Sequence, residues 1–279
     1  GLGDVYKRQS MYWVEEKSLI VGDLHLEKST SYIDQGNFLP PYDTIDTLER
    51  LLNITKELSP NRIIFLGDVM GRSGRHALRD HLPGLINEHQ IDFVIANGEN
   101  SAGGFGITEP ICKELYSYGV NVITTGNHLW DQKDISNYID KDNKLLKPYN
   151  FAEGTPGLGF NTYIDKNGKK IAVINIMGNL FMRSCDNAFF KVEEVLKNID
   201  TQDLSFIFVD FHAEATSEKM AMGHHLDGRV TAVVGTHTHV PTADAVIMEH
   251  GTAFQTDAGM CGDYDLSLIH ISEPTRRLV

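Results

Sequence analysis

Four histidines in three short motifs are the residues of this chain best suited to chemistry. They are His128 in Gly-Asn-His, His212 in Asp-Phe-His, and His237 with His239 in Gly-Thr-His-Thr-His. Side chains at i and i+2 of an extended segment point the same way, so the last two histidines can each reach one of two adjacent metal ions. An isolated histidine on a strand is more often a hydrogen-bonded structural residue. Grouped in this way, the four predict a metal site.

Carboxylate and amide side chains complete the candidate ligand set. Hydrolysis at two hard cations needs oxygen ligands, one carboxylate shared between the ions, and a nearby proton donor. The candidate metal ligands are Asp68, Glu99, Asn127, His212, His237 and His239. His128 directly follows the candidate ligand Asn127, which places it as a catalytic acid rather than a ligand. Taken singly, Asp68 suits a turn and Asn100 a loop cap, but the motifs together predict a dinuclear hydrolytic site.

Short apolar runs precede these motifs and must be the strands that position them. Residues 63–66 and 93–95 are apolar, and so are residues 120–123 apart from Asn121. Each run leads into a polar loop containing glycine, and amphipathic stretches lie between them. This alternation predicts an α/β arrangement. Since loops at the carboxyl ends of parallel strands gather at one edge of a sheet, we expect the three loops to converge on one site.

The pattern changes further along the chain. Residues 159–164 and 170–175 flank an Asp-Lys-Asn-Gly turn, which predicts a hairpin, and we expect a second, more antiparallel sheet to begin there. Residues 204–209 and 230–234 are apolar runs that lead into the two later histidine motifs. Two facing sheets flanked by helices predict a four-layer αββα sandwich with the metals at one rim.

The composition fits a globular enzyme with a small anionic substrate. The chain has 279 residues, of which 41% are hydrophobic and 23% charged. No apolar run approaches the roughly 18 residues that span a bilayer, and no signal segment is apparent, so we expect a cytoplasmic enzyme with no membrane partner. The three cysteines form no Cys-x-x-Cys pair, which argues against a disulfide framework. A net charge of −13 argues against long nucleic acid as a partner.

Long motifs in residues 62–265 resemble the YmdB-type branch of the calcineurin-like metallophosphoesterases. The matching strings are Leu-Gly-Asp at 66–68, Ala-Asn-Gly-Glu-Asn-Ser-Ala-Gly-Gly at 96–104, Thr-Gly-Asn-His at 125–128, Asp-Phe-His-Ala-Glu-Ala-Thr-Ser-Glu-Lys at 210–219 and Gly-Thr-His-Thr-His at 235–239. The resemblance implies a phosphodiesterase that acts on 2′,3′-cyclic nucleotides with two divalent ions, iron or manganese. It also implies that Asp68, Glu99 and His239 hold one ion and that Glu99, Asn127, His212 and His237 hold the other. Glu99 would then bridge the ions, with Asn100 close by and His128 as the acid.

A competing metal-binding motif lies near the N-terminus. Asp23-Leu24-His25 follows an apolar run, and residues 11–61 resemble the start of the ligase-associated DNA-damage-response phosphoesterases. The alternative is therefore a generic metallophosphoesterase in which Asp23, His25 and Asp68 are ligands and Asp68 is the bridge. Spacing favours Glu99, because 99 − 68 = 31 and 127 − 99 = 28 residues each fit one strand-helix-strand unit.

The coexistence of the two resemblances predicts a composite chain. We expect a join near residue 62 between a foreign fragment, 11–61, and the metallophosphoesterase domain, 62–265. Residues 1–10 and 266–279 resemble translated sequencing adapters and are expected to be artefacts. A domain truncated at its C-terminal side would leave a sheet edge uncovered, which favours self-association into a homo-oligomer. A metal-binding regulatory protein with incidental or no activity remains the alternative from a different class.

Overall fold

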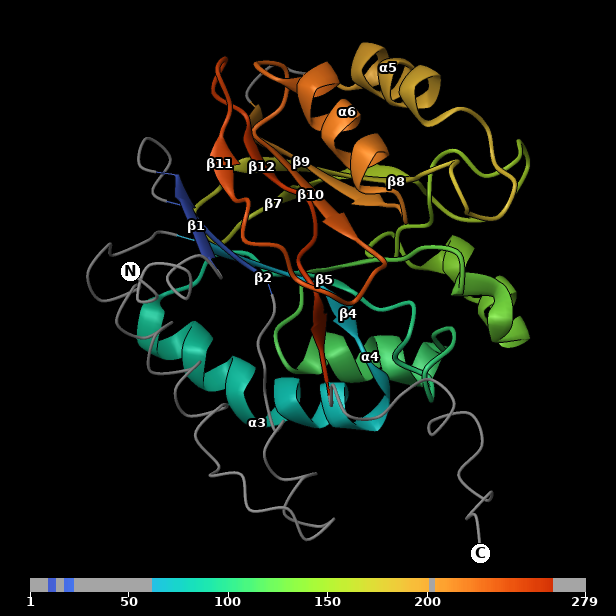
Figure 1. Ribbon diagram of the computed structural model, residues 1–279. Helices are drawn as coiled ribbons and strands as arrows, with labels where there is room; N and C mark the ends of the chain where they lie inside the picture. Colours follow the sequence, from blue (N-terminus) through green and yellow to red (C-terminus); the bar gives the residue numbers. More distant parts are fainter. Residues whose placement is uncertain (1–9, 14–17, 23–61, 201–203, 263–279) are drawn as a thin grey trace, which may run out of the picture.

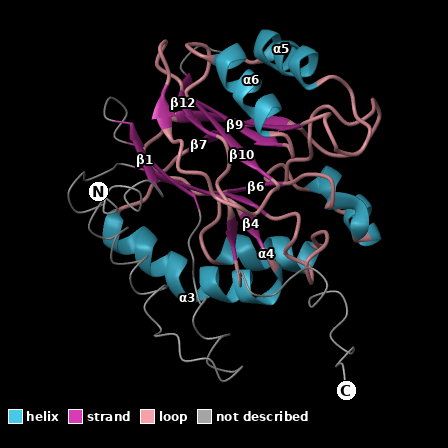
Figure 2. Ribbon diagram, viewed as in Figure 1, coloured by secondary structure: helices cyan, strands magenta, loops and turns pink. Residues whose placement is uncertain are grey.

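A computed structural model describes residues 10–13, 18–22, 62–200 and 204–262 of the chain. Two layers of β-sheet face each other, and helices cover both outer faces (Figures 1 and 2). This order of layers confirms the predicted αββα sandwich. Asp23 and His25 of the competing motif lie outside the described residues. Among the described helices, none combines the length and the apolar character needed to cross a membrane.

The first sheet layer carries the three early motifs at the ends of its strands. Strand β3 (Arg62–Leu66) passes through Gly67 into β4 (Asp68–Val69), which pairs in parallel with β5 (Ile95–Asn97) and β13 (Met260–Cys261). Strand β6 (Val122–Thr124) continues the sheet beside β5, while β2 (Ser18–Gly22) and β1 (Ser10–Trp13) extend it beside β3. Helices α3 (Gly71–His89) and α4 (Glu109–Ser117) cover its outer face (Figure 1). Three short 3-10 helices, η2 (Leu129–Asp131), η3 (Lys133–Asn137) and η4 (Ile139–Lys141), follow β6.

The second sheet has six strands in the order β11-β12-β10-β9-β8-β7. Strands β7 (Phe160–Ile164) and β8 (Lys170–Met177) form the predicted antiparallel hairpin. The second sheet is more antiparallel than the strands β13-β4-β5-β6, as expected, because both of its edge pairs are antiparallel. Its central strands β8, β9 (Leu204–His212), β10 (Ala232–Thr236) and β12 (Ala253–Gln255) are nevertheless parallel neighbours. Helices α5 (Ala188–Asn198) and α6 (Thr216–Leu226) return the chain between these strands, as parallel pairing requires. Only the edge strands β7 and β11 (Val246–Ile247) pair in antiparallel fashion in this sheet.

Alternation along β9 explains why its last residues face the opposite sheet. Phe206 and Phe208 belong to the apolar layer between the two sheets, whereas Val209 packs in the layer beneath α5 and α6. Successive side chains of a strand point to opposite faces, so Asp210 and His212 continue the inward face set by the two phenylalanines. A polar centre therefore takes over from the apolar core at the carboxyl end of the strand.

The same change from apolar to polar occurs on three other strands, two in the first sheet layer and one in the second. On each strand, an inward apolar residue of the inter-sheet core is followed two positions later by a buried polar one. The pairs are Ile95 and Asn97 on β5, Val122 and Thr124 on β6, and Val234 and Thr236 on β10. The polar residues of both sheets thus meet at one rim of the sandwich.

Candidate metal centre and active site

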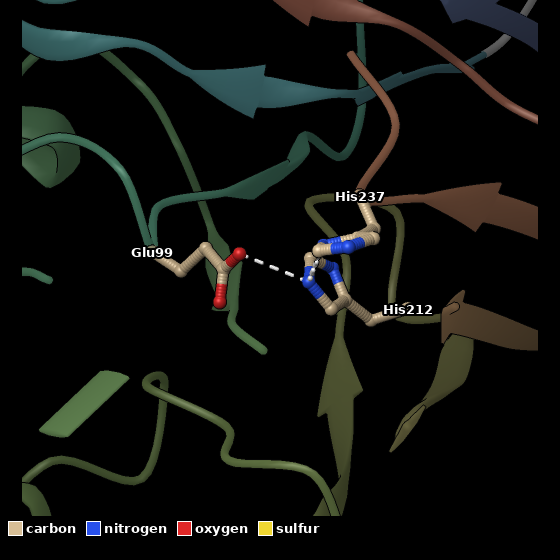
Figure 3. A group of neighbouring side chains, drawn as sticks. All are labelled: Glu99, His212 and His237. Atoms are coloured by element: carbon tan, nitrogen blue, oxygen red, sulfur yellow. Dashed lines mark hydrogen bonds and ion pairs between the residues drawn. The ribbon is translucent and has the colours of Figure 1, made fainter. Parts of the chain in front are cut away.

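A carboxylate and two imidazoles from both sheet layers form the centre of the site. Glu99 Oε1 lies 2.9 Å from His212 Nε2, and His237 Nδ1 lies 3.1 Å from the same nitrogen (Figure 3). Single ligand atoms of the three residues all lie within 4.8 Å of one another. Glu99 and His212 are completely buried, so a charge held here is shielded from solvent.

The remaining predicted ligands surround this centre. Asn127 Oδ1 is 3.1 Å from His212 Nε2 on one side, while on the other Asp68 Oδ1 is 3.7 Å from His239 Nε2. Asn100 lies between the last two residues, because its Nδ2 is 2.9 Å from Asp68 Oδ1 and 3.1 Å from His239 Nε2. The structure therefore gathers all six predicted metal ligands and Asn100 in one place.

The local structure has the features that a metal centre requires. Carboxylate oxygens, amide oxygens and imidazoles are the donors that divalent transition metals accept. Asn100 Oδ1 is buried and, among the described residues, has no hydrogen-bond partner, which leaves a free oxygen at the site. A Cβ on Gly126 would overlap the His212 ring and the Glu99 carboxylate, so only glycine fits there. His237 adopts a φ of 101°, a strained conformation typical of functional positions. The residues fit a bound metal.

The buried carboxylates and imidazoles of the site shift one another's pKa values. Burial would raise the pKa of Asp68, but the neighbouring imidazoles, led by His239, hold this pKa well below its usual range. Burial would likewise depress the pKa of His212, yet the carboxylates of Glu99 and Asp68 raise it to about 9. Burial and the adjacent His212 lower the pKa of His237 to about 3, so that imidazole stays neutral and able to bind a cation.

A buried network behind His212 orients its ring. His212 Nδ1 is 2.9 Å from Thr236 Oγ1, and this hydroxyl donates a 2.6 Å hydrogen bond to Asp210 Oδ1. Asn97 Nδ2 donates to Asp210 Oδ2 at 3.3 Å. Burial raises the pKa of Asp210 to about 6. His212 and the hydroxyls of Thr124 and Thr236, which donate hydrogen bonds to Asp210, act in the opposite direction. Partners of this kind fix which ring nitrogen faces a metal. Asp210 was not among the residues predicted from the sequence, although its Asp-x-His spacing from His212 places both on one face of the strand.

His128 is held beside the Glu99 carboxylate. Its backbone N–H donates to Glu99 Oε2 at 2.9 Å, and its Nδ1 lies 2.6 Å from Asp131 Oδ2. An ionised carboxylate only accepts hydrogen bonds, so Nδ1 is the donor in this contact and Nε2 takes no part in it. Arg183 Nη2 pairs with Asp131 Oδ1 at 3.1 Å. Neither Asp131 nor Arg183 was identified from the sequence, because neither residue belongs to a motif that contains His128.

Two arginines, Arg72 and Arg75, lie on the first turns of α3, shortly after Asp68. Arg75 Nε pairs with Glu114 Oε2 at 3.1 Å, and its guanidinium also donates to the carbonyl of Ser101. Arg72 is exposed. The contacts of Arg75 are structural, since they tie α3 to α4 and to the loop that follows Glu99.

The fold and the site together define a phosphoesterase of the α/β sandwich class, and known proteins agree. Over 204 residues the chain is 50% identical to the 2′,3′-cyclic-nucleotide 2′-phosphodiesterase of Bacillus subtilis (strain 168). The alignment covers 73% of this chain and 76% of that protein. The crystal structure of a phosphatase from Mycoplasma pneumoniae has a TM-score of 0.65 and 37% identity over 71% of each chain. A hypothetical protein from Thermus thermophilus has a TM-score of 0.69 and 37% identity, covering 76% of this chain and 84% of its own.

Residues 64–272 match the family described as YmdB-like protein, and the chain belongs to this family. It is a phosphodiesterase and therefore a hydrolase. The matched range begins two residues after the expected join at 62 and runs past the expected boundary at 265. The origin of residues 1–61 and the artefactual nature of the termini stay predictions.

Proposed function

We propose that the chain hydrolyses 2′,3′-cyclic nucleotides at a centre that holds two divalent cations, with iron or manganese as the first candidates. The observation that carries the proposal is the contact of Glu99 with His212, beside which Asp68 and His239 form a second group of donors. The name of the 50% identical relative from Bacillus subtilis supports the choice of substrate.

Glu99 is the bridging ligand in this proposal. One cation would be held by Asp68, Glu99 and His239, and the other by Glu99, Asn127, His212 and His237. The position of Asn100 supports this division, because its amide lies 2.9 Å from Asp68 Oδ1 and 3.5 Å from Glu99 Oε1. The alternative with Asp68 as the bridge requires Asp23 and His25, which lie outside the described residues.

Bound cations would supply charge neutralisation at the phosphate and lower the pKa of water from about 15.7 toward about 7. The protein's own contribution to the reaction centres on His128. One water adds to phosphorus, the bond from phosphorus to the ribose 2′-oxygen breaks, and that oxygen takes a proton from His128 Nε2. The proton that the water loses is released to solvent and returns to His128 for the next turnover. Asp131 keeps the imidazole oriented for this transfer through its 2.6 Å contact. The product is a 3′-phosphomonoester.

The test loads the full chain with manganese or iron and measures bound metal together with turnover of 2′,3′-cyclic AMP and bis-p-nitrophenyl phosphate. The expected result is two metal ions per chain and conversion of 2′,3′-cyclic AMP to adenosine 3′-monophosphate, identified by phosphorus NMR. Turnover of the p-nitrophenyl ester alone would indicate a generic diesterase. Bound metal without turnover of either compound would indicate a binding or regulatory protein.

A further inference from the structure

An aromatic ring lies directly against the proposed acid. The rings of Phe105 and His128 meet edge to face, with centroids 4.9 Å apart. Phe105 is half-buried in a tight turn closed by a 2.9 Å bond from the Ala102 N–H to the Gly106 carbonyl. Gln132 Nε2 donates to the Phe105 carbonyl at 2.9 Å and fixes this turn to the segment that follows His128. The ring is therefore a fixed wall on the leaving-group side of the site.

A second aromatic residue lies on the loop that follows β8. This loop starts against one end of the site, where the Gly178 N–H donates to the His212 carbonyl at 2.9 Å. It reaches the other end through the 3.1 Å ion pair of Arg183 with Asp131, the partner of His128. Phe181 lies between these two anchors, so the loop carries it along the rim of the site.

The conformation of Phe181 is unusual for a residue whose only role is structural. Its side chain is 89% exposed, and its φ of 62° lies in the left-handed region that bulky residues rarely adopt. The preceding amides are fixed, because the N–H groups of Asn179 and Leu180 donate to the Glu218 carboxylate at 2.8 and 3.2 Å. An exposed aromatic ring held in a strained conformation on an anchored loop is a feature found at ligand sites.

We propose that Phe105 and Phe181 form a subsite that stacks the base of the nucleotide. The inference rests on the proposed function, since it requires a ribose oxygen next to His128. In a 2′,3′-cyclic nucleotide the base is attached to the carbon adjacent to the one bearing the 2′-oxygen. A substrate that takes a proton from His128 must therefore place its base beside the ring in contact with His128. Stacking uses the π-face common to all bases, so this subsite favours large purines without recognising their hydrogen-bonding edges.

The test compares 2′,3′-cyclic AMP with ribose 2′,3′-cyclic phosphate, which has the same reacting group and no base. With the metal-loaded full chain, Phe181→Ala is expected to raise KM for 2′,3′-cyclic AMP about 5- to 20-fold. The KM for ribose 2′,3′-cyclic phosphate should stay unchanged. Phe105→Leu keeps an apolar side chain against His128 and is expected to act in the same direction. Phe190→Ala is the matched control, because Phe190 is also highly exposed, at 77%, but lies on α5 on the outer face of the second sheet.

The outcomes separate this inference from the proposed function. If the wild type turns over both compounds and neither variant changes their KM ratio, the subsite is wrong and the proposed function stands. An equal loss on both compounds also overturns the subsite, because it would reflect damage to His128 rather than loss of base contact. If the wild type turns over neither compound, the proposed function fails and the subsite fails with it. Phe181 is exposed, so its variant tests the subsite even if Phe105→Leu does not fold.

Discussion

At the scale of single residues, the Glu99 carboxylate contacts both His212 and His128. Glu99 directs one carboxylate oxygen to His212 and the other to the backbone of His128. His128 is thereby kept beside the reacting centre, while Asp131 occupies its Nδ1. The proposed ligand His212 and the proposed acid His128 contact different oxygens of this carboxylate, and the contact of His128 is through its backbone N–H. Replacing the His128 side chain should therefore leave Glu99 and His212 in place.

We predict that His128→Ala lowers kcat for 2′,3′-cyclic AMP about 10²- to 10⁴-fold while both metal ions remain bound, because only proton transfer to the leaving oxygen is lost. Kinetics and metal analysis of the same preparation check this. The loss should be smaller with bis-p-nitrophenyl phosphate, whose leaving group departs without a proton. Loss of metal from the variant would contradict the acid role.

Glu99→Ala should empty the site, because both ions lose a shared ligand, whereas Asp23→Ala should leave metal content and activity nearly unchanged. Metal content by atomic emission measures both effects. Glu99→Asp is the matched control, since it keeps the charge and is expected to retain part of the metal. The reverse pattern, with Asp23→Ala emptying the site, would move the bridge to Asp68.

At the scale of elements, a buried ion pair supports the loop that carries His237 and His239. Lys219 Nζ on α6 lies 2.5 Å from Asp257 Oδ2, and both residues are about 1% exposed. The same carboxylate oxygen accepts a 2.8 Å hydrogen bond from Thr238, the residue between the two histidines. Helix α6 and the segment after β12 therefore jointly fix the position of this loop.

Lys219→Met is expected to lower the free energy of unfolding by about 3–5 kcal/mol, because it leaves a carboxylate buried without its partner. Denaturant unfolding measures the loss. The double variant Lys219→Met/Asp257→Leu should recover much of the stability but still bind metal more weakly, since Thr238 has lost its acceptor. Wild-type stability in the single variant would mean that the pair does not hold the loop.

At the scale of the whole molecule, the site joins the two sheets. Asp68, Glu99 and Asn127 come from the first sheet layer or its loops, and the three proposed histidine ligands come from the second. Any cation bound by both groups connects the two layers directly. Metal binding should for this reason stabilise the entire sandwich and not only its rim.

Removal of metal by a chelator should lower Tm. Saturation at about 100 times Kd contributes roughly 2.7 kcal/mol, which corresponds to about 5–10 °C for a domain of this size. Calorimetry of the chelated and reloaded chain measures the shift, and reloading with manganese should reverse it. An unchanged Tm after confirmed metal removal would show that no cation joins the sheets.

Local sequence signals predicted strand existence well and strand limits less well. The Asp-Lys-Asn-Gly turn correctly predicted the β7–β8 hairpin, because the turn residues themselves set the geometry. The apolar run at 120–123 suggested a strand there, but β6 spans Val122–Thr124, since its limits are set by pairing with β5. The parallel pairing of the central strands of the second sheet was not predicted, for the same reason. Strand direction depends on how the intervening helices pack, and no short segment encodes that.

The sequence by itself determined the types of chemical group and their order: carboxylate, amide and imidazole motifs at the ends of apolar runs, which is enough to predict a dinuclear hydrolytic site on a layered α/β fold. Only the tertiary structure decided which atoms meet. Three contacts show this: the 2.9 Å contact of Glu99 with His212, the hydrogen bonds of Thr236 to Asp210 and His212, and the ion pair of Asp131 with Arg183. Each joins residues that are far apart in the sequence. The physical reason is that alternation along a strand fixes the face of a side chain, whereas the packing of one sheet on the other fixes its partner.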